Sequence, residues 1–268
     1  MTNVFPNVDI KGGIVIYLYD KAYDGPCTYT RHSDGIEKTT VRHLHSDGCD
    51  IILRDSNLAD IYRSVHRNGS NKASVADICS SQKPYGLRSD FFGNEAKYSL
   101  PALKESEIDN GYSVLGLDAV SKKRVVKYAD NGYPFPKNGQ LGKYKLFIPR
   151  NYGCGILGEV PASPVLANPN MACTETFVEL GAFDTEAELK NLYSYFKTKF
   201  FRALVGIKKQ DQSASRSIYE YVPLQDFSTS SDIDWSKSVS DIDSQLYSKY
   251  GLSDDEIEFI ESHIKPMD

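Results

Sequence analysis

The 268-residue sequence lacks any apolar stretch of roughly eighteen residues, the length that a helix needs to cross a bilayer. Its first residues, MTNVFPNVDIKGG, also lack the basic start, apolar centre and small-residue cleavage site of a secretory signal. The five cysteines are odd in number and contain no Cys-x-x-Cys pair, which favours reduced thiols over a disulfide framework. These absences lead us to expect a cytoplasmic protein with no membrane partner.

The sequence has a small net charge, −5 from 31 basic and 36 acidic residues, but the two signs are separated along the chain. Between Lys190 and Arg216, seven Lys or Arg accompany a single acid, Asp211. From Asp226 onward the balance reverses, with eleven Asp or Glu against three Lys. The distribution of charge says more about partners than its sum does, and the basic segment requires an anionic partner.

The apolar pattern predicts both strands and helices, with long loops between them. Residues 83–142 are rich in Gly, Pro, Asn and Tyr, which is typical of irregular β structure. Alternating and β-branched residues predict strands at 8–19, 49–53, 112–117, 124–128, 143–149 and 174–180, and short helices at 59–65 and 75–79.

The strongest helix signal begins at Thr185, which forms a capping box with Glu188. Apolar residues then recur three and four positions apart, which predicts one amphipathic helix as far as about Lys209. Its basic residues lie off the apolar face or at its flanks. Basic side chains grouped in this way neutralise phosphates whatever the base sequence, and the polar loop 210–216 that follows carries side chains able to read base edges.

The acidic end of the chain predicts two more helices. The first covers 240–250 and ends at Gly251, and the second begins after Ser253 and covers 254–264. The expected fold class is therefore α+β, with mixed β structure and long loops, one long basic helix, and a C-terminal acidic helical pair.

Residues 153–158, GCGILG, match the Gly-x-Gly-x-x-Gly pattern of a nucleotide-binding loop and follow a predicted strand. Such a loop holds its anion at the start of a helix. Three prolines follow within a few residues, at 161, 164 and 169, and prevent that helix from forming. We therefore predict a loop without a nucleotide.

Residues 42–50, RHLHSDGCD, place His43, His45, Asp47 and Cys49 at alternate positions, so an extended segment would present them on one face. Zinc uses ligands of these types. The sequence Ser46-Asp47-Gly48 is also a turn signal, and no second ligand pair accompanies the histidines. We interpret the segment as a polar surface turn and expect no metal site.

Asp77 followed by Glu95-Ala96-Lys97 matches the order in which many nucleases hold magnesium and orient water. In nucleases this triplet lies on a buried strand, whereas the sequence around Glu95 gives only a weak strand signal. We interpret the triplet as solvated surface and keep a magnesium-dependent restriction nuclease as an alternative.

Several segments together resemble a known family. They are FPNVDIKGGIVIYLYD (5–20), KPYGLR (83–88), YFKTKFFRAL (195–204), YVPLQDF (221–227), SDIDWS (231–236) and IDSQLYSKYGL (242–252). In this order they resemble the C-terminal part of adenine-specific DNA methyltransferases from bacterial type II restriction-modification systems.

In that family a catalytic module with a glycine-rich cofactor loop and an Asn-Pro-Pro-Tyr motif comes first, and the remainder recognises DNA. This chain contains neither motif, and Asn168-Pro169-Asn170 is the nearest approach. The resemblance therefore implies that S-adenosylmethionine binds in a catalytic module absent from this chain, which itself has no cofactor and no catalytic residue. It also implies three parts: 1–55 like the last strands of a methyltransferase sheet, 56–227 for target recognition, and an acidic helical tail at 228–268.

The expected function is to bind duplex DNA and position it for base flipping by the catalytic methyltransferase module or subunit. A protein-interaction subunit, in which the basic aromatic helix docks a protein, is a further alternative beside the nuclease. The predicted DNA-binding residues are Lys83, Arg88, Lys197, Lys199, Arg202, Lys208, Lys209, Gln210, Gln212, Ser213, Ser215 and Arg216.

Overall fold

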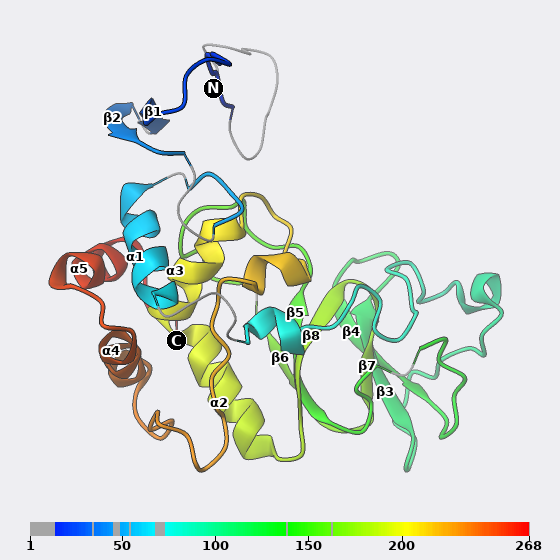
Figure 1. The fold of residues 1–268 in the computed structure, drawn as a ribbon. Coiled ribbons are helices and arrows are strands. Elements are labelled where there is room, and N and C mark those ends of the chain that lie inside the picture. Colours follow the sequence, from blue (N-terminus) through cyan, green and yellow to red (C-terminus); the bar gives the residue numbers. More distant parts are fainter. Residues whose placement is uncertain are drawn as a thin grey trace.

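The chain contains both helices and several small sheets, which confirms the predicted α+β class (Figure 1). The computed structural model describes residues 14–33, 35–44, 49–53, 55–67, 73–137, 139–161 and 163–267. The helices are α1 (Ser56–His66), α2 (Glu186–Lys197), α3 (Lys199–Lys208), α4 (Val239–Tyr250) and α5 (Asp254–His263), with 3₁₀ turns η1 (Val75–Ile78), η2 (Glu95–Tyr98) and η3 (Arg216–Tyr219). The strands are β1 (Cys27–Ser33), β2 (Ile36–Arg42), β3 (Tyr112–Leu117), β4 (Arg124–Ala129), β5 (Tyr144–Pro149), β6 (Val165–Ala167), β7 (Met171–Cys173) and β8 (Phe177–Phe183).

The sheet β6-β5-β8 separates two hydrophobic cores. β5 pairs antiparallel with both neighbours, and successive β5 side chains point to opposite faces. Leu146 and Ile148 belong to the core that contains the helices, whereas Phe147 belongs to a second core with the sheet β4-β3-β7. The turn 174–176 joins β7 of one sheet to β8 of the other, so it lies where the two sheets meet.

The predicted single basic helix is wrong, because two helices, α2 and α3, occupy its place. Thr198 separates them with an extended ψ of 149°. Its hydroxyl donates to the carbonyl of Tyr195 at 2.6 Å and accepts the N–H of Phe201 at 3.1 Å, so one side chain ends α2 and caps α3. Apolar residues keep their spacing of three and four positions on both sides of Thr198, so the sequence pattern does not reveal the break.

The predicted acidic helical pair is confirmed as α4 and α5. Ser238 caps α4, and Ser253 forms a capping box with Glu256 at the start of α5. The apolar faces of both helices, including Ile242 and Ile260, pack in the same core as α2 and α3. The tail is thus part of the main body of the fold (Figure 1).

The predicted strand 8–19 is wrong for its described part, residues 14–19, which are unpaired and between 39% and 99% exposed. Residues 8–13 lie outside the described ranges. The hairpin β1–β2 follows as a two-stranded sheet of its own. The predicted strand 49–53 is also wrong, since its apolar ends are buried within a loop.

Candidate nucleic-acid interface

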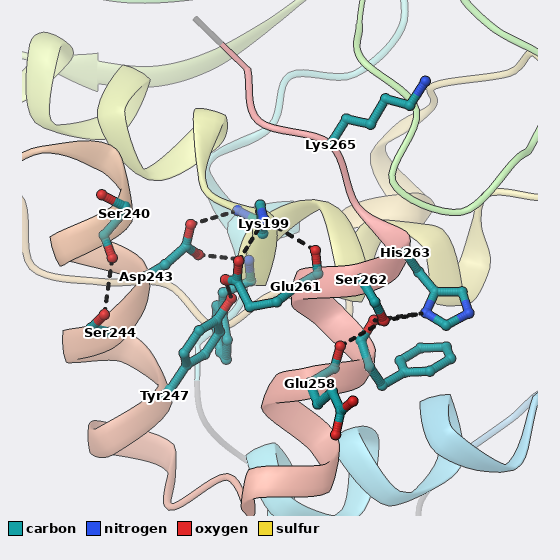
Figure 2. Close-up of polar contacts among 12 residues, drawn as sticks. Lys199, Ser240, Asp243, Ser244, Tyr247, Glu258, Glu261, Ser262, His263 and Lys265 are labelled. Carbon is teal, nitrogen blue, oxygen red and sulfur yellow. Dashed lines mark hydrogen bonds and ion pairs between the residues drawn. The ribbon is translucent and has the colours of Figure 1, made fainter.

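Within the basic segment, Lys199 at the start of α3 pairs with an acid of the C-terminal helices. The Lys199 ammonium lies 2.5 Å from Glu261 Oε2 and 3.3 Å from the Glu261 carbonyl on α5, and 14% of the lysine side chain is exposed. Tyr247 of α4 donates its hydroxyl to the other Glu261 oxygen at 2.8 Å. Figure 2 shows these groups converging from three helices. The acidic tail is therefore the anionic partner of Lys199.

Asp243 of α4 binds the same end of α3. Its carboxylate accepts the backbone N–H of Lys199 at 3.0 Å and of Phe200 at 2.9 Å, as Figure 2 shows. The first turn of a helix leaves these donors without helical partners, and a negative charge there also suits the helix dipole. Burial raises the pKa of Asp243 to about 6, and the two hydrogen bonds oppose that rise.

Arg202 lies inside the fold, with 3% of the residue exposed. Its guanidinium donates to the carbonyl oxygens of Thr198 at 3.3 Å, Gly158 at 3.0 Å and Lys265 at 2.5 Å. It thereby ties α3 to the glycine loop and to the chain after α5. This placement corrects the prediction for Arg202, which is a residue of the core and not of a DNA-facing surface.

Lys208, at the end of α3, is likewise paired inside the protein. Its ammonium lies 3.2 Å from Asp50, is paired with Glu220 and sits 4.4 Å from the ring centre of Tyr221. Only 11% of its side chain is exposed. The prediction of Lys208 as a DNA-binding residue does not fit this placement, because the carboxylates of Asp50 and Glu220 already lie against its ammonium.

Lys209 and the glycine loop 153–158 share the carboxylate of Glu159. The carboxylate of Glu159 accepts the backbone N–H groups of Cys154 at 2.8 Å and Gly155 at 3.2 Å, and it pairs with Lys209, whose side chain is 2% exposed. A Cβ on Gly155, at φ +84°, would lie 2.3 Å from the facing backbone. The loop amides thus hold the chain's own carboxylate, and no helix begins among the glycines, as predicted.

Three predicted cations remain accessible on loops. The side chains of Arg88 and Arg216 are 55% and 56% exposed, and that of Lys83 is 33% exposed. Arg88 Nε lies 3.6 Å from Glu175 and Arg216 lies 3.9 Å from Asp77, beyond hydrogen-bond length. A guanidinium has five N–H donors, so both arginines keep most of their capacity for a ligand.

Backbone hydrogen bonds place these loops side by side. Glu175 N donates to the Leu87 carbonyl at 2.8 Å, Arg150 N to the Thr176 carbonyl at 2.8 Å, and Ala214 N to the Arg150 carbonyl at 2.7 Å. The loop after η1, the turn 174–176, Arg150 and the loop 210–216 therefore adjoin one after another. We call the following side chains the loop surface: Lys83, Arg88, Arg150, Gln212, Ser213, Ser215 and Arg216.

Arg150 is a member of the loop surface that the sequence pattern does not indicate. It directly follows β5 and is half-buried, and its guanidinium has no hydrogen bond or ion pair to any residue that the structure describes. Strand periodicity ends one residue earlier, so only the three-dimensional arrangement reveals Arg150. Among the other predicted residues, Gln212 is exposed, and Gln210, Ser213 and Ser215 are half-buried.

Lys197 lies on α2 and so does not belong to the loop surface. It is half-buried, with its ammonium 5.4 Å from the ring centre of Tyr193. The side chain thus packs along an aromatic ring of its own helix, four residues back.

The residues of the nuclease alternative have separate partners. Lys97 is paired with Asp90 at 2.9 Å, whereas Asp77 accepts the N–H of Ser74 at 2.8 Å. Glu95 and Lys97 lie on η2, which has no buried residue. The positions of these three residues therefore fit the predicted solvated surface better than a buried catalytic strand.

Among the described residues, no three His, Cys, Asp or Glu side chains are grouped to hold a metal ion. In the histidine segment, His43 is exposed and Cys49 is buried, while His45 and Asp47 lie outside the described ranges. None of the helices in the described part of the chain has the length and apolar character that a bilayer span requires.

No protein-family model matches the chain, and no curated protein matches it. The fold and the site by themselves define an α+β protein in which Lys199, Arg202, Lys208 and Lys209 of the basic segment are held by internal partners, while Arg88 and Arg216 remain accessible.

The raised pKa of Asp243 makes part of the stability depend on pH. The folded-state pKa of about 6 exceeds the ordinary value of 3.8, so this group favours the folded state most below pH 3.8, and that contribution is lost as the pH rises through about 6. We expect the melting temperature of the wild type to fall relative to that of Asp243→Asn between about pH 4 and about pH 7. A difference that stays constant across this range contradicts the assignment.

Lys209→Met removes the cation from Glu159 and leaves a largely buried carboxylate without its partner. We expect a loss of about 3 kcal/mol in the free energy of unfolding, measured with urea. The control is Lys190→Met, which breaks an exposed pair with Glu186 and is expected to cost about 0.5 kcal/mol or less. Equal losses for the two variants would contradict a structural role for Lys209.

Proposed function

We propose that the chain is the DNA target-recognition portion of an adenine-N6 DNA methyltransferase of a restriction-modification system. It binds duplex DNA and positions it for base flipping by a catalytic module absent from this chain. The observation that carries the proposal is the loop surface, which offers accessible guanidinium groups beside an exposed amide. Arginine recognises guanine and glutamine recognises adenine in the major groove, and loops fixed by backbone hydrogen bonds are suitable carriers for such contacts.

The charge of the loop surface favours base reading over non-specific attraction. Four cations, Lys83, Arg88, Arg150 and Arg216, stand against the carboxylates of Asp77, Glu175 and Asp211. This near balance gives a weak field for phosphates in general, so we expect a modest dependence of DNA affinity on salt.

The N-terminal part supports a catalytic partner. Residues 14–19, IVIYLY, are uncharged and exposed, and the hairpin β1–β2 forms a sheet of only two strands, which is marginally stable without further support. In the proposed division, residues 1–55 complete a sheet of the catalytic module, 56–227 recognise the target, and the helical tail 228–268 packs against α3. S-adenosylmethionine would bind in that module, and free cysteines fit a cytoplasmic location.

The double variant Arg88→Ala with Arg216→Ala tests the proposal. We expect weaker duplex binding in a salt titration, with the slope of log affinity against log salt reduced by roughly 0.9 for each phosphate that the variant no longer neutralises. An arginine that reads a base instead changes sequence preference, by about 1–3 kcal/mol per base pair.

The matched control is Arg63→Ala. Arg63 has a side-chain exposure of 57%, close to those of Arg88 and Arg216, and it also lies beside a carboxylate, Asp60, but on α1. DNA affinity and sequence preference that are identical in the double variant, the control and the wild type would rule out the loop surface as the DNA interface.

A further inference from the structure

Glu175 is an acid at the centre of the loop surface, where a carboxylate repels a polyanion. The residue is 8% exposed, and both of its oxygens face the loop that follows η1. Oε1 accepts the N–H of Ser89 at 3.2 Å and lies 3.6 Å from Arg88 Nε. Oε2 accepts from the Gln82 amide at 3.4 Å and lies 4.0 Å from the Lys83 ammonium. One carboxylate thus contacts both ends of the loop.

The centre of the same loop is anchored in the second core. Tyr85 is fully buried, and its hydroxyl donates to Glu179 at 2.8 Å. Lys83 has a left-handed φ of 56°, and Gly86, at φ 77°, would place a Cβ 2.5 Å from Pro136. Tyr85 and Gly86 thus fix the middle of the loop, and Glu175 lies beside the charged groups of Lys83 and Arg88 on either side of it.

We propose that Glu175 is a positioning residue that orients Arg88 and Lys83 and thereby sets the base-pair preference of the loop surface. This inference rests on the proposed function. A carboxylate at this position weakens the general attraction of the surface for DNA. By drawing two neighbouring cations towards one point, it narrows the directions in which they meet a ligand, and so it exchanges general affinity for selectivity.

Two variants of Glu175 separate these roles. Glu175→Gln removes the charge and both ion pairs but keeps an oxygen for the Ser89 N–H, whereas Glu175→Ala removes every side-chain contact. Glu258→Gln, at an exposed position of α5, is the control for removal of one negative charge. Melting temperatures report whether each variant folds.

The wild type is first used to select a preferred sequence from a pool of random duplexes. The ratio of its affinities for the selected duplex and for a scrambled duplex of the same composition then measures selectivity. We expect this ratio to fall roughly tenfold in Glu175→Gln and further in Glu175→Ala, while affinity for the scrambled duplex is maintained or rises. The ratio should be unchanged in Glu258→Gln.

Hydrogen exchange of the free protein provides a readout that requires no DNA. We expect faster exchange at 82–89 in Glu175→Ala, with the exchange of α3 unchanged. Unchanged selectivity in both Glu175 variants, or unchanged exchange in that loop, overturns the inference while leaving the proposed function intact. If the wild type itself shows no salt-sensitive binding to any duplex, the proposed function fails, and the inference fails with it.

Discussion

The contact between α3 and the acidic C-terminal helices determines how the rest of the molecule uses its charge. Asp243 binds the free N–H groups at the start of α3, and Glu261 holds Lys199 beside it. Burying polar and charged groups costs several kcal/mol unless they are paired and hydrogen-bonded, and Asp243 and Glu261 supply these partners at the start of α3. Part of the separation of charge along the sequence is therefore an internal attraction between the start of α3 and the acidic tail.

The same principle governs the far end of α3. Glu159 neutralises Lys209 and is itself held by loop amides, while Asp50 and Glu220 neutralise Lys208. The central helices thus offer little free charge to a phosphate backbone. On the loop surface, by contrast, Arg88 and Arg216 remain accessible and Lys83 is partly so. These cations are few, so the direction of each side chain matters more than their number.

The sequence predicts the fold class, the acidic helical pair and the caps at Thr185 and Ser253, because these depend on local periodicity and short-range hydrogen bonds. It cannot predict the break at Thr198, since the apolar spacing of α2 continues into α3. It also assigns Arg202 and Lys209 to the surface, because the carbonyl and carboxylate groups that enclose them come from positions roughly 40 to 60 residues away in sequence. For the candidate site, the sequence indicates the loop 210–216 and the segment KPYGLR. Arg150 and Glu175, which join them, become visible only through the arrangement of the strands.

In the proposed function, DNA meets the loop surface and not the basic helices. Hydrogen exchange of the full chain, with and without a saturating duplex, tests this claim most directly, because it reports on every segment at once. We expect slower exchange in residues 82–89 and 210–217, and no change in α2 and α3. Slower exchange confined to α2 and α3, with both loops unaffected, would contradict this claim.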